Sequence, residues 1–264
     1  MQIGKETRAL VTGANGGIGT AIARALHAAG ATIVVTGRRA DALRPLADAI
    51  GAHVVVADLA QPADVVRCMD EAGPIDVLVA NAALPSSGPL TSFDDDQIDR
   101  ALDVNLRAPI VMARHAAPGM LERGRGQIVF ISSISGKVAG PGTSMYSATK
   151  FGLRGFSLGL REDLHGTGVG VTTIFPGFIS DAGMFADTKV TLPRGAGTRT
   201  PEQVADAVLR AIRDDPAEIT VAAFEQSLGA LLAGISPPLV ASIQRLVGGG
   251  KIARQIADAQ AHKR

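Results

Sequence analysis

The segment RALVTGANGGIGTAIARALHAAG, residues 8–30, decides the fold, because it joins a short apolar run to a glycine-rich turn and then to an amphipathic stretch. The run Arg8–Thr12 predicts a buried strand, and Ile18–Ala29 has helical periodicity. Glycine permits a tight turn close to a ligand, and the free N–H groups that begin a helix attract a pyrophosphate. The segment therefore predicts a nucleotide site at Gly13, Asn15, Gly17, Ile18 and Gly19.

The spacing of these glycines differs from the common dinucleotide fingerprint. Gly13, Gly17 and Gly19 give G-x-x-x-G-x-G, whereas the fingerprint is G-x-G-x-x-G. A glycine cluster alone is weak evidence, although its position between a strand and a helix strengthens it. The remaining chain has to support the interpretation.

Short apolar runs alternate with longer amphipathic segments up to about residue 220. Runs such as ATIVVT and DVLVA are apolar nearly throughout, which is typical of parallel strands covered on both faces. The pattern predicts one α/β domain over residues 1–264, with a doubly wound parallel sheet of about seven strands and helices on both faces. The expected strands are Arg8–Thr12, Thr32–Thr36, His53–Ala57, Val77–Ala80, Gln127–Ser132, Gly170–Phe175 and Glu218–Val221.

Composition excludes several classes of function. Lys and Arg number 26 against 25 for Asp and Glu, so no net field favours nucleic acid or an anionic membrane. The single cysteine, Cys68, cannot form an intramolecular disulfide, and the five histidines lack metal-site spacing, so we expect no metal. The N-terminus lacks the apolar core of a signal peptide, which favours a cytoplasmic location.

Two arginines follow the second expected strand, where the adenosine ribose of a dinucleotide would lie. Arg38 and Arg39 favour a 2′-phosphate, whereas an acidic residue would favour a free 2′-hydroxyl. This predicts NADP(H); NAD(H) remains the alternative if both arginines simply face solvent. Asp58, followed by Leu59, ends the third strand and could accept a hydrogen bond from an adenine amino group or cap the next segment.

The only tyrosine, Tyr146, lies four residues before Lys150 in SMYSATKFG, residues 144–152. On a helix the two side chains project from the same face. A neighbouring cation lowers the pKa of a phenol from about 10, so the tyrosine could exchange a proton near neutral pH. Taken alone, the pair could equally be two surface residues on one helix.

Seven motifs together resemble the short-chain dehydrogenase/reductase family over about residues 6–216. They are TGANGGIG (12–19), ADL (57–59), ANAAL (80–84), VNL (104–106), VFISSISG (129–136), YSATK (146–150) and PGFISD (176–181). The resemblance implies a Rossmann-type fold and an oxidoreductase that transfers hydride between nicotinamide and a carbonyl or secondary alcohol. It further implies cofactor contacts at Gly13, Asn15, Gly17, Ile18, Gly19, Arg38, Arg39, Asp58, Leu59, Asn81, Ala82, Tyr146, Lys150, Pro176, Gly177 and Ile179.

The resemblance also assigns four catalytic residues. Tyr146 is expected to act as general acid or base on the substrate oxygen, and Ser133, thirteen residues earlier, to hydrogen-bond the same oxygen. Lys150 is expected to lower the Tyr146 pKa and hold the nicotinamide ribose, and Asn105 to anchor a water that links Lys150 to solvent. Structural roles remain open, because Ser133 could cap a turn and Asn105 could bond only backbone.

Two residues depart from the family pattern that the resemblance implies. Ala83 replaces a glycine and brings a methyl group close to the expected adenosine ribose. Asp181 replaces a threonine that bonds the nicotinamide carboxamide, and an ionised carboxylate can only accept. We therefore expect a slightly altered fit at both positions.

Residues 181–200 correspond to the substrate loop that the family builds at this point. Their apolar side chains suggest an apolar substrate, with subunit packing as the alternative. The apolar residues of the loop are Met184, Phe185, Val190 and Leu192. The sequence leaves the substrate's identity, the direction of the reaction and the pathway open.

A helical extension is expected over residues 222–264. The uncharged run Gln226–Gln244 contains a Pro-Pro break and is too interrupted for a membrane span. We expect one helical face to pack on its own domain or a sister subunit, with a lid over an apolar substrate or a membrane surface as alternatives. That face comprises Phe224, Leu228, Leu231, Leu232 and Ile235.

By family analogy we expect a homodimer or homotetramer through helices at 96–121 and 146–165. The partner of the site is a small carbonyl or alcohol. A non-catalytic dinucleotide-binding sensor or scaffold is the competing interpretation, but a sensor needs no proton donor such as Tyr146.

Overall fold

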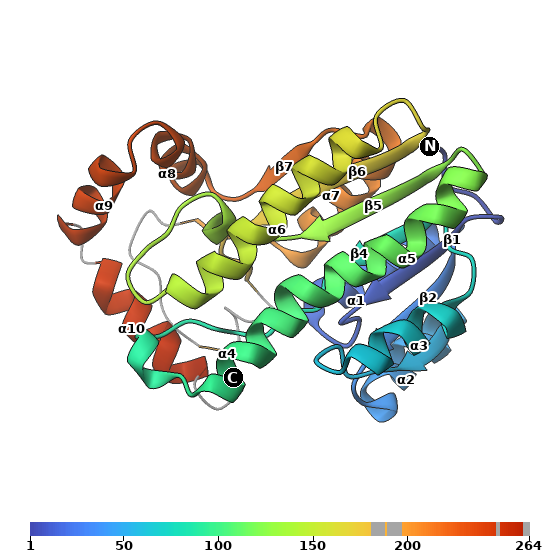
Figure 1. Cartoon of the computed structure of the whole chain (residues 1–264), viewed down its shortest axis with the longest axis horizontal. Coiled ribbons are helices and arrows are strands. Elements are labelled where there is room, and N and C mark those ends of the chain that lie inside the picture. The colour runs from blue at the N-terminus through green and yellow to red at the C-terminus, as the bar shows by residue number, and fades with distance from the viewer. Residues whose placement is uncertain (181–187, 189–196, 247–248, 261–264) are drawn as a thin grey trace.

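A parallel sheet forms the centre of the computed structural model, which describes residues 1–180, 188, 197–246 and 249–260 (Figure 1). Within those residues seven strands pair in the order β3-β2-β1-β4-β5-β6-β7. The strands are β1 (Arg8–Thr12), β2 (Thr32–Gly37), β3 (His53–Val56), β4 (Val77–Ala80), β5 (Gly126–Ile131), β6 (Val169–Pro176) and β7 (Glu218–Val221). All seven predicted strands are confirmed, and the strand order reverses between β1 and β4, where such sheets leave a crevice at their carboxyl ends.

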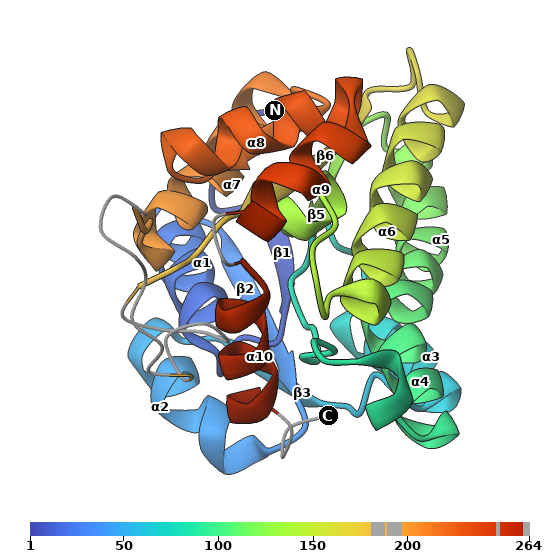
Figure 2. The same ribbon diagram turned by 90° about the vertical axis from the view of Figure 1, so that its left-hand side faces the viewer.

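Helices cover both faces of the sheet, as Figure 2 shows end-on. The first face carries α1 (Gly17–Ala28), α2 (Ala40–Ile50) and α7 (Pro201–Asp214). The second face carries α3 (Pro62–Ala72), α5 (Ala108–Glu122) and α6 (Ser144–Asp163). The predicted doubly wound architecture is therefore confirmed.

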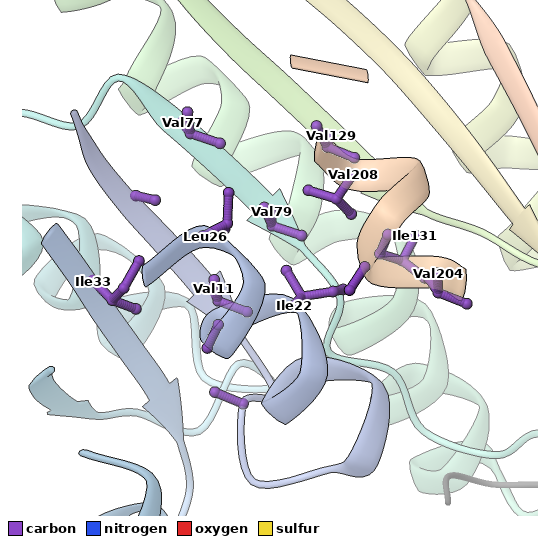
Figure 3. Packing of buried hydrophobic residues seen from close by; sticks show 14 of the residues in the cluster. Val11, Ile22, Leu26, Ile33, Val77, Val79, Val129, Ile131, Val204 and Val208 are labelled. Carbon is purple, nitrogen blue, oxygen red and sulfur yellow. The ribbon is translucent and has the colours of Figure 1, made fainter. Parts of the chain in front are cut away.

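Neighbouring residues of a strand point to opposite faces, and both faces are apolar. Val11 packs among the α1 and α7 residues, whereas Leu10 packs among those of α3 and α5, and both are fully buried. Figure 3 shows the first face, where Ile22, Leu26, Val204 and Val208 of the helices meet Val11, Val79, Val129 and Ile131 of the strands. Burial on both sides explains why the strand sequences are apolar nearly throughout.

Helix α4 (Asp95–Leu102) begins at an Asp94 capping box and continues through the π-helical segment η2 (Asp103–Arg107) into α5. Asp94 accepts a hydrogen bond from the Gln97 N–H at 2.8 Å, and the Gln97 side chain accepts one from the Asp94 N–H at 3.3 Å. The cap fixes where α4 starts, and η2 carries Asn105 at the interior of the fold.

The C-terminal extension forms α8 (Phe224–Ile235), α9 (Pro237–Leu246) and α10 (Gly249–Gln260), beyond the carboxyl ends of the strands (Figures 1 and 2). The large apolar face of α8 was expected to pack on its own domain or on a sister subunit, and it does not pack on its own domain; packing on a sister subunit stays a prediction. Phe224 and Ile235 are each 77% exposed, and the buried residues of α8 are Ala230 and Ala233. The small alanine side of the helix faces the protein because it permits a closer approach of the backbone.

No helix in the described part of the chain combines the length and apolar character needed to cross a membrane. The same residues contain no group of three or more His, Cys, Asp or Glu side chains that could hold a metal ion. Asp181 and the four apolar residues of the expected substrate loop lie outside the described residues, so the structure does not test the roles predicted for them.

Candidate active site

The glycine turn between β1 and α1 is shaped for close approach. Gly13 adopts a φ of +64°, and a Cβ added at Gly19 would lie 2.8 Å from the Ala14 Cα. Helix α1 starts after Gly16, which has no side chain to cap the first turn. The N-terminus of α1 is thus left free of a side-chain cap, as an anion-binding helix end requires.

Thr12 and Asn81 tie the glycine turn to the end of β4. The Thr12 hydroxyl accepts hydrogen bonds from the N–H groups of Asn81 at 2.9 Å and Ala82 at 2.8 Å. The Asn81 amide donates to the Thr12 carbonyl at 2.8 Å. Sequence reasoning identified Asn81 but missed Thr12, whose only signal was a hydroxyl at the last position of a strand.

A cavity of about 1120 Å³ opens at the carboxyl ends of the strands. Of the predicted site residues, only Asn105 does not line it. Those that do are Gly13, Asn15, Gly17, Ile18, Gly19, Arg38, Arg39, Asp58, Leu59, Asn81, Ala82, Ser133, Tyr146, Lys150, Pro176, Gly177 and Ile179. The fold thus gathers residues that are up to 166 positions apart in the chain, from Gly13 to Ile179, around one space.

At one end of the cavity, Arg38 and Arg39 follow β2 and are exposed. Asp58 follows β3, and its carboxylate pairs with Arg100 of α4 at 3.1 Å and accepts a hydrogen bond from the Ala60 N–H at 3.1 Å. Helix α3 begins after Gln61, so Asp58 does not cap it. Sequence reasoning missed Arg100, which also lines the cavity.

At the other end, Tyr146 and Lys150 project from the first two turns of α6. Lys150 is 2% exposed, and its ammonium donates to the Ile131 carbonyl at 3.1 Å and lies 5.6 Å from the centre of the Tyr146 ring. Ser133 lines the same cavity and lowers the pKa of Tyr146, and its hydroxyl also caps the next turn by accepting from the Ser135 N–H at 3.1 Å. Neighbouring Ser132 instead donates to the Lys150 carbonyl at 3.2 Å, so the spacing argument selected the serine that faces the phenol.

The pKa values of this pair differ from the expectation. Burial raises the pKa of Tyr146 to about 12, and the nearby Ser133 hydroxyl lowers it only in part. Burial lowers the pKa of Lys150 to about 8. The predicted lowering of the Tyr146 pKa by Lys150 is therefore not found, because removing both groups from water outweighs their mutual effect.

Asn105 is fully buried, and its side chain forms hydrogen bonds with backbone atoms instead of lining the cavity. Its carbonyl oxygen accepts from the Leu84 N–H at 2.6 Å, and its amide donates to the Leu84 carbonyl at 2.9 Å. This side chain thus fits the alternative in which Asn105 bonds only backbone. It connects the segment after β4 to η2. The segment it holds, Ala82–Pro85, lines the cavity.

The family model of short chain dehydrogenases matches residues 7–191. The chain belongs to the short-chain dehydrogenase/reductase family. It is therefore an NAD(P)-dependent oxidoreductase that acts on CH–OH and C=O groups. The C-terminal helices α8 to α10 lie beyond the matched residues.

Relatives and solved structures agree with this family membership. Ketoacyl reductase HetN of Nostoc sp. (strain PCC 7120) is 38% identical over 222 residues, which cover 80% of this chain and 77% of HetN. A solved short chain dehydrogenase/reductase family protein superposes with a TM-score of 0.77 at 32% identity, covering 84% of this chain and 97% of its own. The closed form of serine dehydrogenase complexed with NADP⁺ has a TM-score of 0.72 at 33% identity, with 81% and 93% covered.

The residues of this short-chain dehydrogenase fit a dinucleotide. The N-terminus of α1, which lacks a side-chain cap, and the positive-φ turn at Gly13 suit the pyrophosphate. Arg38, Asp58 and Asn81 would hold the adenosine side, and Lys150 the nicotinamide ribose. Of the two departures from the family pattern, Ala83 lines the cavity and Asp181 lies outside the described residues.

Proposed function

We propose that this enzyme is an NADP(H)-dependent reductase of a carbonyl group on an apolar substrate, with Tyr146 as the general acid. The observation that carries the proposal is that Ser133, Tyr146 and Lys150 line one cavity whose other end presents Arg38 and Arg39. A bound nicotinamide supplies the hydride. The protein itself supplies the proton from Tyr146, the positive charge of Lys150 and the side chains that orient the substrate carbonyl.

Tyr146 suits proton donation. With a pKa of about 12 its hydroxyl is protonated at neutral pH, so it can give a proton to an oxygen that gains negative charge. Ser133, which lines the same cavity, would orient the substrate carbonyl and stabilise the developing charge. Because Tyr146 is protonated and can donate, reduction is the direction to assay first.

Lys150 places a positive charge beside the Tyr146 ring. Its ammonium lies 5.6 Å from the ring centre, and with a pKa of about 8 it is mostly charged at neutral pH. The bond to the Ile131 carbonyl fixes the ammonium at the end of β5, where it can also meet the ribose hydroxyls of the cofactor. A water anchored near Asn105 would complete the proton path; the Asn105 side chain itself serves Leu84.

Arg38 and Arg39 support NADP(H) over NAD(H). A guanidinium binds a phosphate through charge-assisted hydrogen bonds, and both arginines are exposed at the cavity end beside β2 and β3. Solved relatives whose titles name NADP provide further support. NAD(H) is the alternative if both side chains turn away from the ribose.

An apolar substrate is supported by the walls near Tyr146. Leu84, Val104, Ile134 and Phe178 line the cavity with apolar atoms. A 3-oxoacyl thioester is the first candidate, because a relative from Rickettsia conorii is named a 3-oxoacyl-[acyl-carrier-protein] reductase and HetN is named a ketoacyl reductase. Its acyl chain matches the apolar walls and its ketone matches Tyr146.

We further propose a cytoplasmic homodimer or homotetramer that associates through α4, α5 and α6. These helices expose large apolar side chains on the single chain. They are Leu102, Leu121, Phe151 and Leu158, which are 36%, 41%, 41% and 39% exposed.

The test follows oxidation of NADPH and NADH with a 3-oxoacyl thioester and a set of apolar ketones, for the wild type and Tyr146→Phe. Turnover with NADPH that is lost in the variant, while NADPH still binds, is the expected result. Preference for NADH would contradict the role of Arg38 and Arg39. Tight cofactor binding without turnover on any carbonyl would favour a sensor.

A further inference from the structure

The chain enters and leaves the segment 181–196 through two adjacent stretches of backbone. We call 177–180, which follows β6, the outgoing stem, and 197–200, which precedes α7, the return stem. The Ser180 N–H donates to the Arg199 carbonyl at 2.8 Å, and the Arg199 N–H donates to the Phe178 carbonyl at 2.9 Å. The backbones of the two stems are thus hydrogen-bonded to each other. A side chain that bonds both stems can therefore fix their position.

Gln226, in the first turn of α8, bonds both stems with one side-chain amide. Its oxygen accepts from the Phe178 N–H at 3.2 Å, and its nitrogen donates to the Gly197 carbonyl at 2.9 Å. These two bonds need an acceptor and a donor on the same side chain, and the neutral amide supplies them on two separate atoms. The side chain is half-buried and lines the cavity.

The backbone around Gln226 is built for this close approach. A Cβ added at Gly197 would lie 2.9 Å from the Ala223 Cβ, and one added at Gly177 would lie 2.9 Å from the Ala222 Cβ. The Glu225 carboxylate also accepts from the Gly197 N–H at 2.7 Å. A larger residue at either glycine would push α8 away from the stems, so the junction depends on both.

The outgoing stem borders the catalytic half of the cavity. It continues β6, which pairs with β5, and β5 leads directly to Ser133. The arginines proposed to read the 2′-phosphate follow β2, on the far side of β1 and β4. Gly177, Phe178 and Ile179 therefore form a wall beside Tyr146 and not beside Arg38.

We propose that Gln226 is a positioning residue, which sets the wall formed by Gly177–Ile179 against the nicotinamide and the substrate and so makes α8 part of the catalytic apparatus. This inference rests on the proposed function. It predicts that loss of the amide weakens ligands that reach the catalytic half and spares ligands that occupy only the adenosine half.

The experiment compares wild type, Gln226→Leu, Gln226→Glu and the control Ser227→Ala. Ser227 is the next residue of α8, and its hydroxyl bonds the Ala223 carbonyl at 3.1 Å within the helix. Dissociation constants are measured for NADPH and for 2′,5′-ADP, which reaches only the adenosine half. Turnover gives kcat and KM for the carbonyl substrate, and melting temperature monitors the fold.

Gln226→Leu should weaken NADPH binding about tenfold and raise KM for the carbonyl substrate, with the Kd of 2′,5′-ADP unchanged. Gln226→Glu keeps the acceptor but sets a carboxylate against the Gly197 carbonyl, so it should share the defect. Ser227→Ala should match the wild type. Equal loss of both ligands with a lower melting temperature would show a merely structural role and overturn the proposal, and so would unchanged binding and kinetics.

Failure of the proposed function would show in the wild type. If the wild type binds NADPH and 2′,5′-ADP and reduces the carbonyl, but Gln226→Leu behaves like Ser227→Ala, only the Gln226 inference fails. If the wild type binds neither ligand, the NADP(H) proposal fails and the Gln226 inference falls with it.

Discussion

The ammonium of Lys150 lies 5.6 Å from the centre of the Tyr146 ring and donates to the Ile131 carbonyl. In the structure, the burial that brings the two groups together raises the pKa of Tyr146 to about 12 and lowers that of Lys150 to about 8. At neutral pH Tyr146 is therefore a neutral phenol, whereas Lys150 is still mostly charged although burial disfavours its charge.

The first prediction concerns stability and pH. Since the Lys150 pKa is about 8 in the fold and 10.5 unperturbed, the charged side chain destabilises the fold fully below pH 8, and the penalty falls as pH rises from 8 to 10.5. Lys150→Met should therefore raise the free energy of unfolding at pH 7 by about 1–3 kcal/mol. Urea unfolding at pH 7 and pH 10 measures it, and the gain should shrink at the higher pH. A less stable variant at pH 7 would mean that the bond to Ile131 dominates.

The second prediction separates the two adjacent serines. Ser133→Ala removes the hydroxyl that we propose to bond the substrate oxygen beside Tyr146, so kcat should fall about 10²- to 10³-fold with a small change in KM. Ser132→Ala removes a bond to the Lys150 carbonyl, which is a structural contact, and should lower kcat far less. Steady-state kinetics on both variants decides between them. Equal losses would contradict the assignment of Ser133.

The third prediction concerns the coenzyme. Arg38→Ala with Arg39→Ala should lower the preference for NADPH over NADH by about tenfold or more, because charge-assisted bonds to a phosphate are lost. Arg44→Ala is the control, since Arg44 is exposed on α2 and outside the main cavity. The ratio of kcat/KM for the two coenzymes is the measurement. An unchanged ratio would assign the arginines to solvent.

The fourth prediction concerns Asn105. Asn105→Ala leaves the part-buried N–H and carbonyl of Leu84 without the side chain that bonds both, which should cost about 2 kcal/mol of stability. The control Arg107→Ala, an exposed position of the same π-helical segment, should change stability by less than about 0.5 kcal/mol. Thermal unfolding compares the two. A wild-type melting temperature for Asn105→Ala would exclude the fastening role.

Sequence predicted the strands and most of the site because both depend on local patterns. A strand such as Val77–Ala80, buried on two faces, has to be apolar throughout, and site residues follow directly after strands at fixed motif positions. Gly13, Ser133 and Gly177 were found in this way. What the motifs could not supply was the direction of side chains inside the helices.

The missed features depend on contacts between distant segments. Arg100 reaches Asp58 across 42 positions, and Gln226 reaches Phe178 across 48. No periodicity marks such pairs. The prediction for the apolar face of α8 missed its own domain for a related reason. A stripe of large residues such as Phe224, Leu231 and Ile235 indicates a buried face only when no face of smaller residues on the same helix packs more closely. The raised pKa of Tyr146 could not be predicted either, because it depends on how deeply the phenol is buried in the folded protein.

The exposed position of Arg38 and Arg39 has a consequence for how such an enzyme can change over time. Their side chains lie at the rim of the cavity, while Leu43 and Leu46, a few residues later, anchor α2 in the core. Under the proposed coenzyme assignment, selection of the coenzyme depends on two residues before α2, whereas the fold depends on leucines within α2. One or two codon changes there could move the enzyme between the reducing and oxidising coenzyme pools of a cell, with its scaffold intact.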